Sequence, residues 1–294
     1  MKKTRTQTYP LMQTDGGLSF AILMIGYILL AFFIQAVLLA FTDVNSTLYV
    51  AVNSLVSPLA MLLVILYQVK SKGRSIGVLS LNKFNKLHLL TALLLSIGMF
   101  LGLGFVNLLF ADFLGEIGLN VPSPTIPLNN PFELILFSIT VALLPAVFEE
   151  LFFRGILLNS LKGENLIARV FTVGLCFALY HCSVSQFVYQ FIYGVAFCLL
   201  ALVAKSVIPC IIAHFINNFS ILLFTYLNID VDLTNILFIV IGVVALIGYF
   251  LISCFGLKGQ NQQVPKKGVK FFYLPYGLFG IGICLIVLLG NLFG

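Results

Sequence analysis

The chain alternates between long apolar runs and short polar segments. An α-helix rises about 1.5 Å per residue, so about 20 apolar residues cross the ~30 Å hydrocarbon core of a bilayer. Runs of that length predict nine membrane-spanning helices, and the expected fold class is an all-α, polytopic integral membrane protein. The predicted spans are approximately 17–42, 48–69, 87–111, 131–158, 166–183, 186–204, 207–227, 233–256 and 272–293.

The polar segments between these runs are short. The longest, 70–86, 112–130 and 257–271, leave no room for a soluble domain, and no internal repeat is visible. We therefore expect a single membrane domain over residues 1–294. The first apolar run is too long for the core of a signal peptide, and polar residues separate it from the basic N-terminal segment. This pattern predicts an uncleaved first span.

The composition agrees with a lipid-embedded chain. Hydrophobic residues make up 61% of the sequence and charged residues 9%, against roughly 25% charged residues in a soluble domain. The six cysteines all lie in apolar runs and form no CxxC pair. They are predicted to be small buried side chains, and neither a disulfide framework nor a thiolate metal site is expected. These cysteines are Cys176, Cys182, Cys198, Cys210, Cys254 and Cys284.

The distribution of charge gives an orientation. With a cytoplasmic N-terminus, all 16 Lys and Arg residues fall on the cytoplasmic side of the nine predicted spans and none falls outside. This satisfies the positive-inside rule, so the net charge of +6 is expected to reflect topology and lipid-headgroup contact, and no nucleic-acid partner is expected. The basic residues include Lys2, Lys3, Arg5, Lys266 and Lys267, and the outer segments carry Asp43, Asp112, Glu116, Glu133, Asp230 and Asp232.

Charged side chains inside the spans are costly and therefore mark candidate functional positions. Glu149, Glu150 and Arg154 lie near the inner end of the fourth span. Glu150 and Arg154 are four residues apart, so one helix face carries both and they can form an ion pair. Glu149 is rotated by about 100° from Glu150 and can face a different space.

Two histidines and an amide join these acids from other spans. His181 closes the fifth span, while His214 and Asn218 lie four residues apart in the seventh and point together. Counted from the nearest basic residue at 1.5 Å per residue, these three and Glu149 all fall between the inner leaflet and the midplane. The four side chains are therefore expected to meet in one pocket.

Three short stretches carry a family resemblance. EELFFR at 149–154, FALYH at 177–181 and HFINN at 214–218 resemble the EExxxR, FxxxH and HxxxN motifs of the CPBP family. That family comprises the type II CAAX prenyl endopeptidases and the bacteriocin-processing or immunity proteins also called Abi. The resemblance covers residues 141–223, the expected catalytic motif core. Three motifs in successive apolar spans are specific, whereas any one alone would be weak.

The resemblance implies intramembrane hydrolysis of a peptide bond. Glu149 would be the general base that deprotonates the attacking water, and His181 would hold that water. His214 and Asn218 would donate hydrogen bonds to the oxyanion, with Glu150 and Arg154 as a supporting pair. The implied partner is a membrane-bound peptide or protein substrate in the plasma (cytoplasmic) membrane.

The cofactor is open at this stage. Glu149, His181 and His214 are also a plausible Zn²⁺ ligand set with an open fourth position. The chain has no HExxH motif, and the three ligands would come from three separate helices. A metal-free mechanism based on the glutamate is the equal alternative.

Several other readings remain. One alternative function is a non-enzymatic bacteriocin-immunity or chaperone-like membrane protein that keeps the motifs as structure. A proton-coupled transporter is a third class, although repeat symmetry is lacking. Asn217 competes with Asn218 for the amide role, while Phe177 is expected only to pack. Cys182 is a poor candidate nucleophile, since it is adjacent to His181 and adjacent side chains on a helix point in different directions. Substrate identity and oligomeric state are open.

Overall fold

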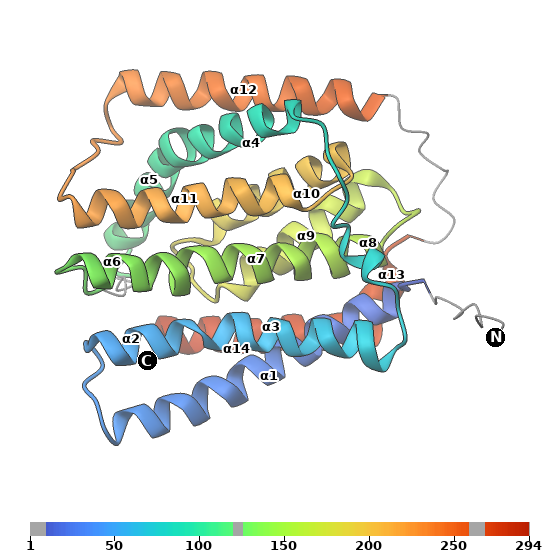
Figure 1. Cartoon of the computed structure of the whole chain (residues 1–294), viewed down its shortest axis with the longest axis horizontal. Coiled ribbons are helices and arrows are strands. Elements are labelled where there is room, and N and C mark those ends of the chain that lie inside the picture. The colour runs from blue at the N-terminus through green and yellow to red at the C-terminus, as the bar shows by residue number, and fades with distance from the viewer. Residues whose placement is uncertain (1–9, 120–125, 259–267, 294) are drawn as a thin grey trace.

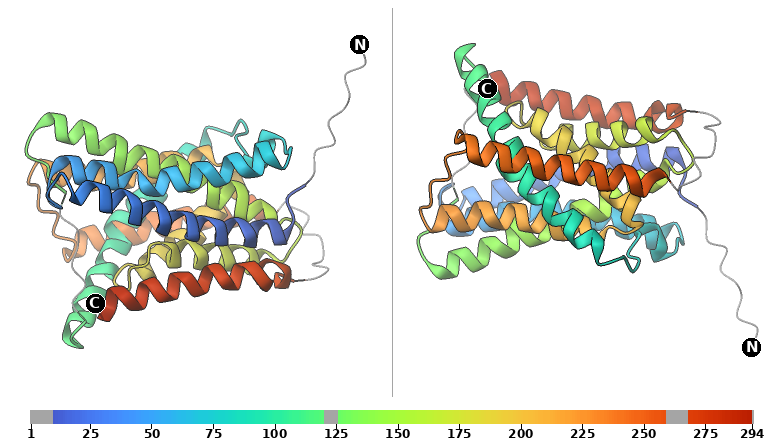
Figure 2. Two further views of the ribbon diagram at one scale, coloured as in Figure 1. Left: turned by 90° about the horizontal axis from the view of Figure 1, so that it is seen from below. Right: turned by 90° about the horizontal axis from the view of Figure 1, so that it is seen from above.

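The computed structural model describes residues 10–119, 126–258 and 268–293, and over these ranges the chain is all-helical, with no strand. The long helices lie side by side with their axes roughly along one direction, so the chain forms a bundle (Figure 1). Views from below and above show that the teal-to-green helix of α4 and α5 (Leu87–Glu116) crosses the other helices diagonally (Figure 2). The predicted all-α class is confirmed.

Eight helices in the described ranges are long and apolar enough to cross a membrane. Four are uninterrupted: α1 (Gln13–Leu39), α10 (Phe187–Ala204), α11 (Ile208–Tyr226) and α12 (Ile236–Lys258). The other four contain π-helical segments: α2–α3–η1 (Thr47–Ser54, Val56–Leu66, Tyr67–Ser71), α4–η3–α5 (Leu87–Ile97, Gly98–Leu103, Gly104–Glu116), α6–η4–α7–η5–α8 (Pro131–Phe137, Ser138–Leu143, Leu144–Glu150, Leu151–Leu157, Leu158–Ser160) and α13–η6–α14 (Lys270–Phe272, Tyr273–Gly277, Leu278–Phe293). A short 3-10 turn, η2 (Ile76–Leu79), precedes α4.

The ninth predicted span, 166–183, corresponds to the shorter apolar helix α9 (Leu166–Tyr180). Its 15 residues reach only about 22 Å, so the count of nine full-length spans is not confirmed. The helix ends where Cys182 adopts a left-handed backbone with φ of 47° and polar residues follow. The predicted span runs three residues too far, to Ser183, because hydropathy alone does not detect the turn that ends the helix.

Helices α9 and α10 form a closely packed hairpin. A Cβ atom added to Gly194 would lie 2.8 Å from the Cα of Gly174, so the two backbones touch at these glycines. Small residues of this kind allow membrane helices to pack closely. The contact holds the middle of α9 against α10, and the carbonyl of Gly194 accepts a hydrogen bond from Arg154 of the helix that carries Glu149 and Glu150.

The acidic pair lies on a helix with two unusual turns. In Pro131–Ser160, the π-helical segments η4 and η5 flank α7, which ends at Glu150. Pro145 lies in the first turn of α7, where it cannot donate a backbone hydrogen bond and its ring crowds the preceding turn. The wider turn of η4 accommodates the proline without breaking the helix. Single π turns inside α-helices occur frequently at functional sites.

Charge differs between the two ends of the bundle. The acidic end, at the left of Figure 1, carries Asp43, Asp112, Glu116, Glu133, Asp230 and Asp232. The basic residues outside the spans flank the helix ends gathered at the right of Figure 1, where α1, α4, α9 and α13 begin and α12 ends. At that end Asp15 forms an ion pair with Arg74 at 2.6 Å. The predicted basic residues Lys2, Lys3, Arg5, Lys266 and Lys267 lie outside the described residues. The described basic residues of this end are Lys70, Lys72, Arg74, Lys83, Lys86, Lys162, Arg169, Lys205, Lys258 and Lys270.

Five of the six cysteines are buried and all six are free thiols, as the sequence predicts. Cys254 is the exception, because it is exposed on α12. This helix lies at the edge of the bundle (Figure 1), and its outer face carries exposed apolar side chains such as Val244 and Phe255. An apolar run does not distinguish a lipid-facing position from a core position, so burial of Cys254 was wrongly predicted.

Candidate active site

The ion pair expected from the i, i+4 spacing is present at the end of α7. Arg154 Nη1 lies 3.1 Å from Glu150 Oε1, and both side chains are fully buried. Arg154 also donates to the carbonyl of Gly194 at 3.2 Å and lies over the rings of Phe177 and Phe197, at 4.4 and 5.1 Å from their centroids. A carboxylate, a carbonyl and two aromatic faces thus enclose the buried guanidinium, which a charge inside a membrane protein requires.

His214 of α11 connects the two glutamates. Its Nδ1 lies 2.9 Å from Glu150 Oε1, and its Nε2 lies 3.9 Å from Glu149 Oε2. Because the Glu150 carboxylate paired with Arg154 can only accept, Nδ1 is the donor in the first contact. The second distance is too long for a hydrogen bond. Glu149 Oε2 is buried and has no hydrogen-bond partner among the described residues.

His181 caps the C-terminus of α9. Its Nδ1 lies 2.8 Å from the carbonyl oxygen of Phe177, one helical turn earlier. A carbonyl only accepts, so Nδ1 carries the hydrogen, and Nε2 of the neutral ring remains as an acceptor. Phe177 packs edge-on against His181 with ring centroids 4.7 Å apart, so its expected packing role is present. The FxxxH spacing therefore fixes both the tautomer and the orientation of the histidine.

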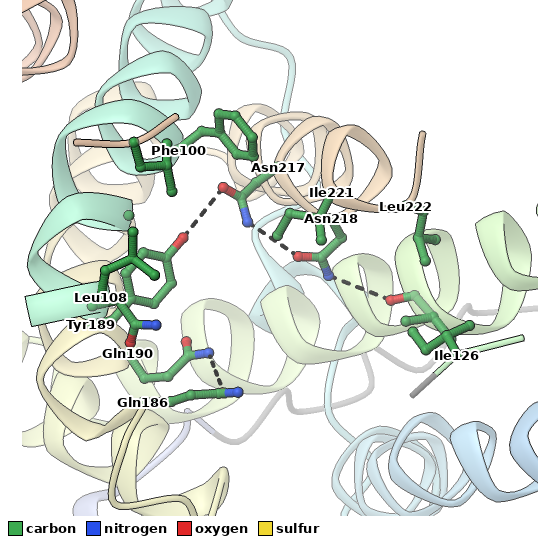
Figure 3. A pocket seen from close by; sticks show the side chains of 14 residues that line it. Phe100, Leu108, Ile126, Gln186, Tyr189, Gln190, Asn217, Asn218, Ile221 and Leu222 are labelled. Atoms are coloured by element: carbon green, nitrogen blue, oxygen red, sulfur yellow. Dashed lines mark hydrogen bonds between the residues drawn. The ribbon is translucent and has the colours of Figure 1, made fainter. Parts of the chain in front are cut away.

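The two amides of α11 form a hydrogen-bonded chain (Figure 3). Tyr189 donates to Asn217 Oδ1 at 3.4 Å, and Asn217 donates to Asn218 Oδ1 at 3.3 Å. Asn218 Nδ2 in turn donates to the carbonyl of Val141 at 3.5 Å. Since an amide group carries two N–H bonds, Asn218 keeps one for another acceptor.

The structure brings Glu149, His181, His214 and Asn218 to the wall of one cavity of about 310 Å³. Glu150 and Arg154 are fully buried behind them. The remaining walls include residues that sequence reasoning missed, namely Tyr27, Ser57, Tyr180, Tyr189, Gln190 and Tyr193.

One local sequence pattern could have predicted part of this wall. Gln186, Tyr189, Gln190 and Tyr193 follow the i, i+3, i+4, i+7 spacing of one helix face on α10. A polar stripe of this kind in an apolar span indicates a face turned toward the bundle interior. Tyr27 and Ser57 lie far away in sequence, on α1 and α3, and no local pattern connects them to the motifs.

Residues 131–220 match the family model described as type II CAAX prenyl endopeptidase Rce1-like. Over these residues, fewer than half of the 294, the chain is similar to the CAAX protease family. No curated protein and no solved structure matched the chain. The CAAX protease segment runs from α6 through most of α11 and contains all six predicted site residues, whereas α1 and α3 outside it contribute only Tyr27 and Ser57 to the cavity. The family is one of intramembrane proteases.

Glu149, His181 and His214 are the zinc ligands that the sequence allows. The described residues contain no group of three or more His, Cys, Asp or Glu side chains that could hold a metal ion. Glu149 Oε2 and His214 Nε2 lie 3.9 Å apart, and His181 keeps Nε2 free because Nδ1 donates to the Phe177 carbonyl, but the three side chains do not come together as such a group. As placed, the three side chains do not fit a zinc site, so the chemistry below uses only the protein's own groups.

Proposed function

We propose that this chain is an intramembrane endopeptidase that hydrolyses a peptide bond in a membrane-associated peptide or protein. Its catalytic motif core would be residues 141–223, within one membrane domain over 1–294. The observation that carries the proposal is the single cavity lined by Glu149, His181, His214 and Asn218. A base, a water-holding acceptor and two oxyanion donors are the groups that acyl transfer to water requires.

Glu149 acts as the general base in this proposal. It lines the cavity, and His214 Nε2 lies 3.9 Å from its Oε2, beyond hydrogen-bond distance, whereas Glu150 is bound by Arg154 at 3.1 Å. A water held by His181 Nε2 gives one proton to Glu149 while its oxygen attacks the substrate carbonyl carbon. When the C–N bond of the tetrahedral intermediate breaks, Glu149 returns that proton to the departing amine, so the enzyme is regenerated.

His214 and Asn218 stabilise the oxyanion of that intermediate. Since Nδ1 of His214 donates to Glu150, donation from Nε2 requires the doubly protonated ring. With that ring, Glu149, Glu150, Arg154 and His214 sum to zero charge. Proton transfer to Glu149 then leaves the four groups one unit positive, opposite to the new oxyanion. The rise in positive charge coincides with the negative charge that it stabilises.

The two neighbouring amides, Asn217 and Asn218, have different roles in this proposal, because only Asn218 donates to the oxyanion. Asn218→Ala is expected to lower kcat for peptide hydrolysis by about 10²–10³-fold, the usual cost of removing one oxyanion donor. Asn217→Ala is expected to cost less, because Asn217 acts by orienting Asn218. Steady-state kinetics of the purified variants measures both effects. A larger loss for Asn217→Ala than for Asn218→Ala would contradict the assignment.

We further propose a cytoplasmic N-terminus and a location in the plasma (cytoplasmic) membrane, because the basic end of the bundle would then lie inside. The orientation does not depend on whether α9 crosses fully. The α9–α10 hairpin begins and ends at the basic end, so the spans on either side keep their direction.

An impermeant maleimide applied to intact cells tests this orientation. In a Cys254→Ser background, Asp43→Cys and Asp230→Cys are expected to be labelled directly, because both lie in loops at the acidic end. Lys72→Cys is expected to react only after the membrane is permeabilised. The opposite labelling pattern would show that the bundle is inverted.

A further inference from the structure

A second, larger cavity of about 530 Å³ adjoins the candidate active site. The two cavities share part of their walls, which places them next to each other. Figure 3 shows the larger cavity, with the amide chain of α11 at its side. The shared residues are Val141, Tyr189, Gln190, Asn217 and Asn218.

The larger cavity extends along the bundle toward its acidic end. On α11 the walls continue from His214, which lines the smaller cavity, to Leu222, which lines the larger one. On the motif helix, Glu149 lines the smaller cavity, and Val141, in the direction of α6, lines both cavities where they meet. Both pairs are eight residues apart, or about 12 Å at 1.5 Å per residue. An extended peptide covers this length with three to four residues at about 3.3–3.6 Å each.

The chemistry of the walls selects an uncharged occupant. None of the 14 lining side chains is charged. A charged substrate side chain placed here would lose its hydration without gaining an opposite charge. Five amides and a tyrosine hydroxyl provide donors and acceptors that suit a peptide backbone, whereas a purely hydrocarbon ligand would leave them unpaired. These polar residues are Asn107, Gln186, Tyr189, Gln190, Asn217 and Asn218.

The larger cavity reaches the surface of the bundle. Two of its lining residues, Leu108 of α5 and Ile221 of α11, are 40% and 47% exposed. Both belong to membrane-spanning helices, so this part of the wall contacts the lipid side. A substrate segment already in the membrane can therefore enter between α5 and α11.

We infer that the larger cavity is a substrate subsite, which holds three to four uncharged residues on one side of the scissile peptide bond. The inference rests on the proposed endopeptidase function, because it uses the catalytic cavity to place the bond. The amide-rich wall binds the backbone of the segment, and the apolar residues contact its side chains. Substrates with a charge within that segment are excluded.

Cleavage of a peptide pool by the purified full-length protein in detergent tests this subsite. With a chymotryptic digest of a bacterial lysate as the pool, mass spectrometry of the products gives the residues around each cleaved bond, and their frequencies are compared with those in the pool. We expect Asp, Glu, Lys and Arg to be depleted about tenfold or more at three to four adjacent positions on one side only. Equal acceptance of charged residues on both sides would overturn the inference.

Two neighbouring leucines of α5 provide a matched pair of variants. Leu108 lines the cavity and Leu109, also exposed, does not. Leu108→Lys is expected to make Asp and Glu acceptable in the segment, with a fivefold or greater gain, whereas Leu109→Lys leaves the profile unchanged. Gly104→Leu, which fills the same cavity, is expected to raise KM for peptides with large residues in the segment. Identical profiles for the wild-type protein, Leu108→Lys and Gly104→Leu would refute the subsite.

A binding measurement separates the subsite from the chemistry. A fluorescent uncharged peptide of Ala, Asn and Leu is titrated into the Glu149→Gln variant and followed by anisotropy. We expect saturable binding, and we expect the affinity to fall at least fivefold when one Ala in the segment is replaced by Glu. Adding Leu108→Lys to the Glu149→Gln protein is expected to restore the affinity for the Glu-containing peptide. Binding with this pattern but without cleavage in the active protein would sink only the endopeptidase function. Equal binding of both peptides would sink the subsite.

Discussion

Glu149→Gln protein is expected to hydrolyse peptides about 10²–10⁴-fold more slowly than the wild-type protein, the usual contribution of a general base. Glutamine keeps the size of the side chain but cannot take a proton from water. Glu149 Oε2 has no hydrogen-bond partner among the described residues, so the replacement disturbs little of the surrounding structure. Steady-state kinetics on the purified protein gives the loss in kcat, and thermal unfolding in detergent shows whether the fold is retained.

Glu116→Gln is the matched control, because Glu116 is exposed at the acidic end of the bundle. It makes the same chemical change outside the cavity and is expected to leave kcat unchanged. Undiminished hydrolysis by a folded Glu149→Gln protein would exclude Glu149 as the general base. No hydrolysis of any peptide by the folded wild-type protein would favour a non-enzymatic immunity or chaperone-like role.

Arg154→Met should give the largest loss of stability. It removes the guanidinium that pairs with the fully buried Glu150 carboxylate, and breaking a buried ion pair typically costs about 3–5 kcal/mol. The variant also loses the donor to the Gly194 carbonyl, which ties the motif helix to the α9–α10 hairpin. Thermal or denaturant unfolding in detergent measures the effect. An unfolding midpoint equal to that of the wild-type protein would contradict the structural role of the pair.

The double variant Glu150→Leu/Arg154→Met separates stability from activity. Removing both charges leaves no unpaired ion, so much of the lost stability is expected to return. Activity is not expected to return, because His214 loses the carboxylate that holds its Nδ1. Recovery of full hydrolysis together with stability would show that Glu150 has no part in positioning His214.

Features that depend on residues within a single helix were predictable from the sequence. Hydropathy located eight full-length helices, and the i, i+4 spacing placed Glu150 beside Arg154, since both depend on residues of one helix. The end of α9 was not predictable in this way. The helix stops at Tyr180, just before the left-handed backbone at Cys182, and hydropathy does not report backbone conformation.

Contacts between distant helices could not be derived from spacing. The hydrogen bond from His214 to Glu150 joins residues 64 positions apart, and nothing local in either span indicates it. The same holds for Tyr27 and Ser57, which enter the cavity wall from α1 and α3. The motifs identified the catalytic groups, while the partner that orients each group depends on how the helices pack.

A single-turnover cleavage in water enriched in oxygen-18 tests the central claim most directly, because a water activated by Glu149 would add its oxygen to the substrate carbonyl. With protein in excess over a peptide that it cleaves, mass spectrometry of the first product shows the origin of the new carboxylate oxygen. We predict one oxygen-18 atom in every new carboxylate during the first turnover. A first-turnover product that carries ordinary oxygen from a protein side chain would show covalent catalysis and would contradict a water-activating glutamate.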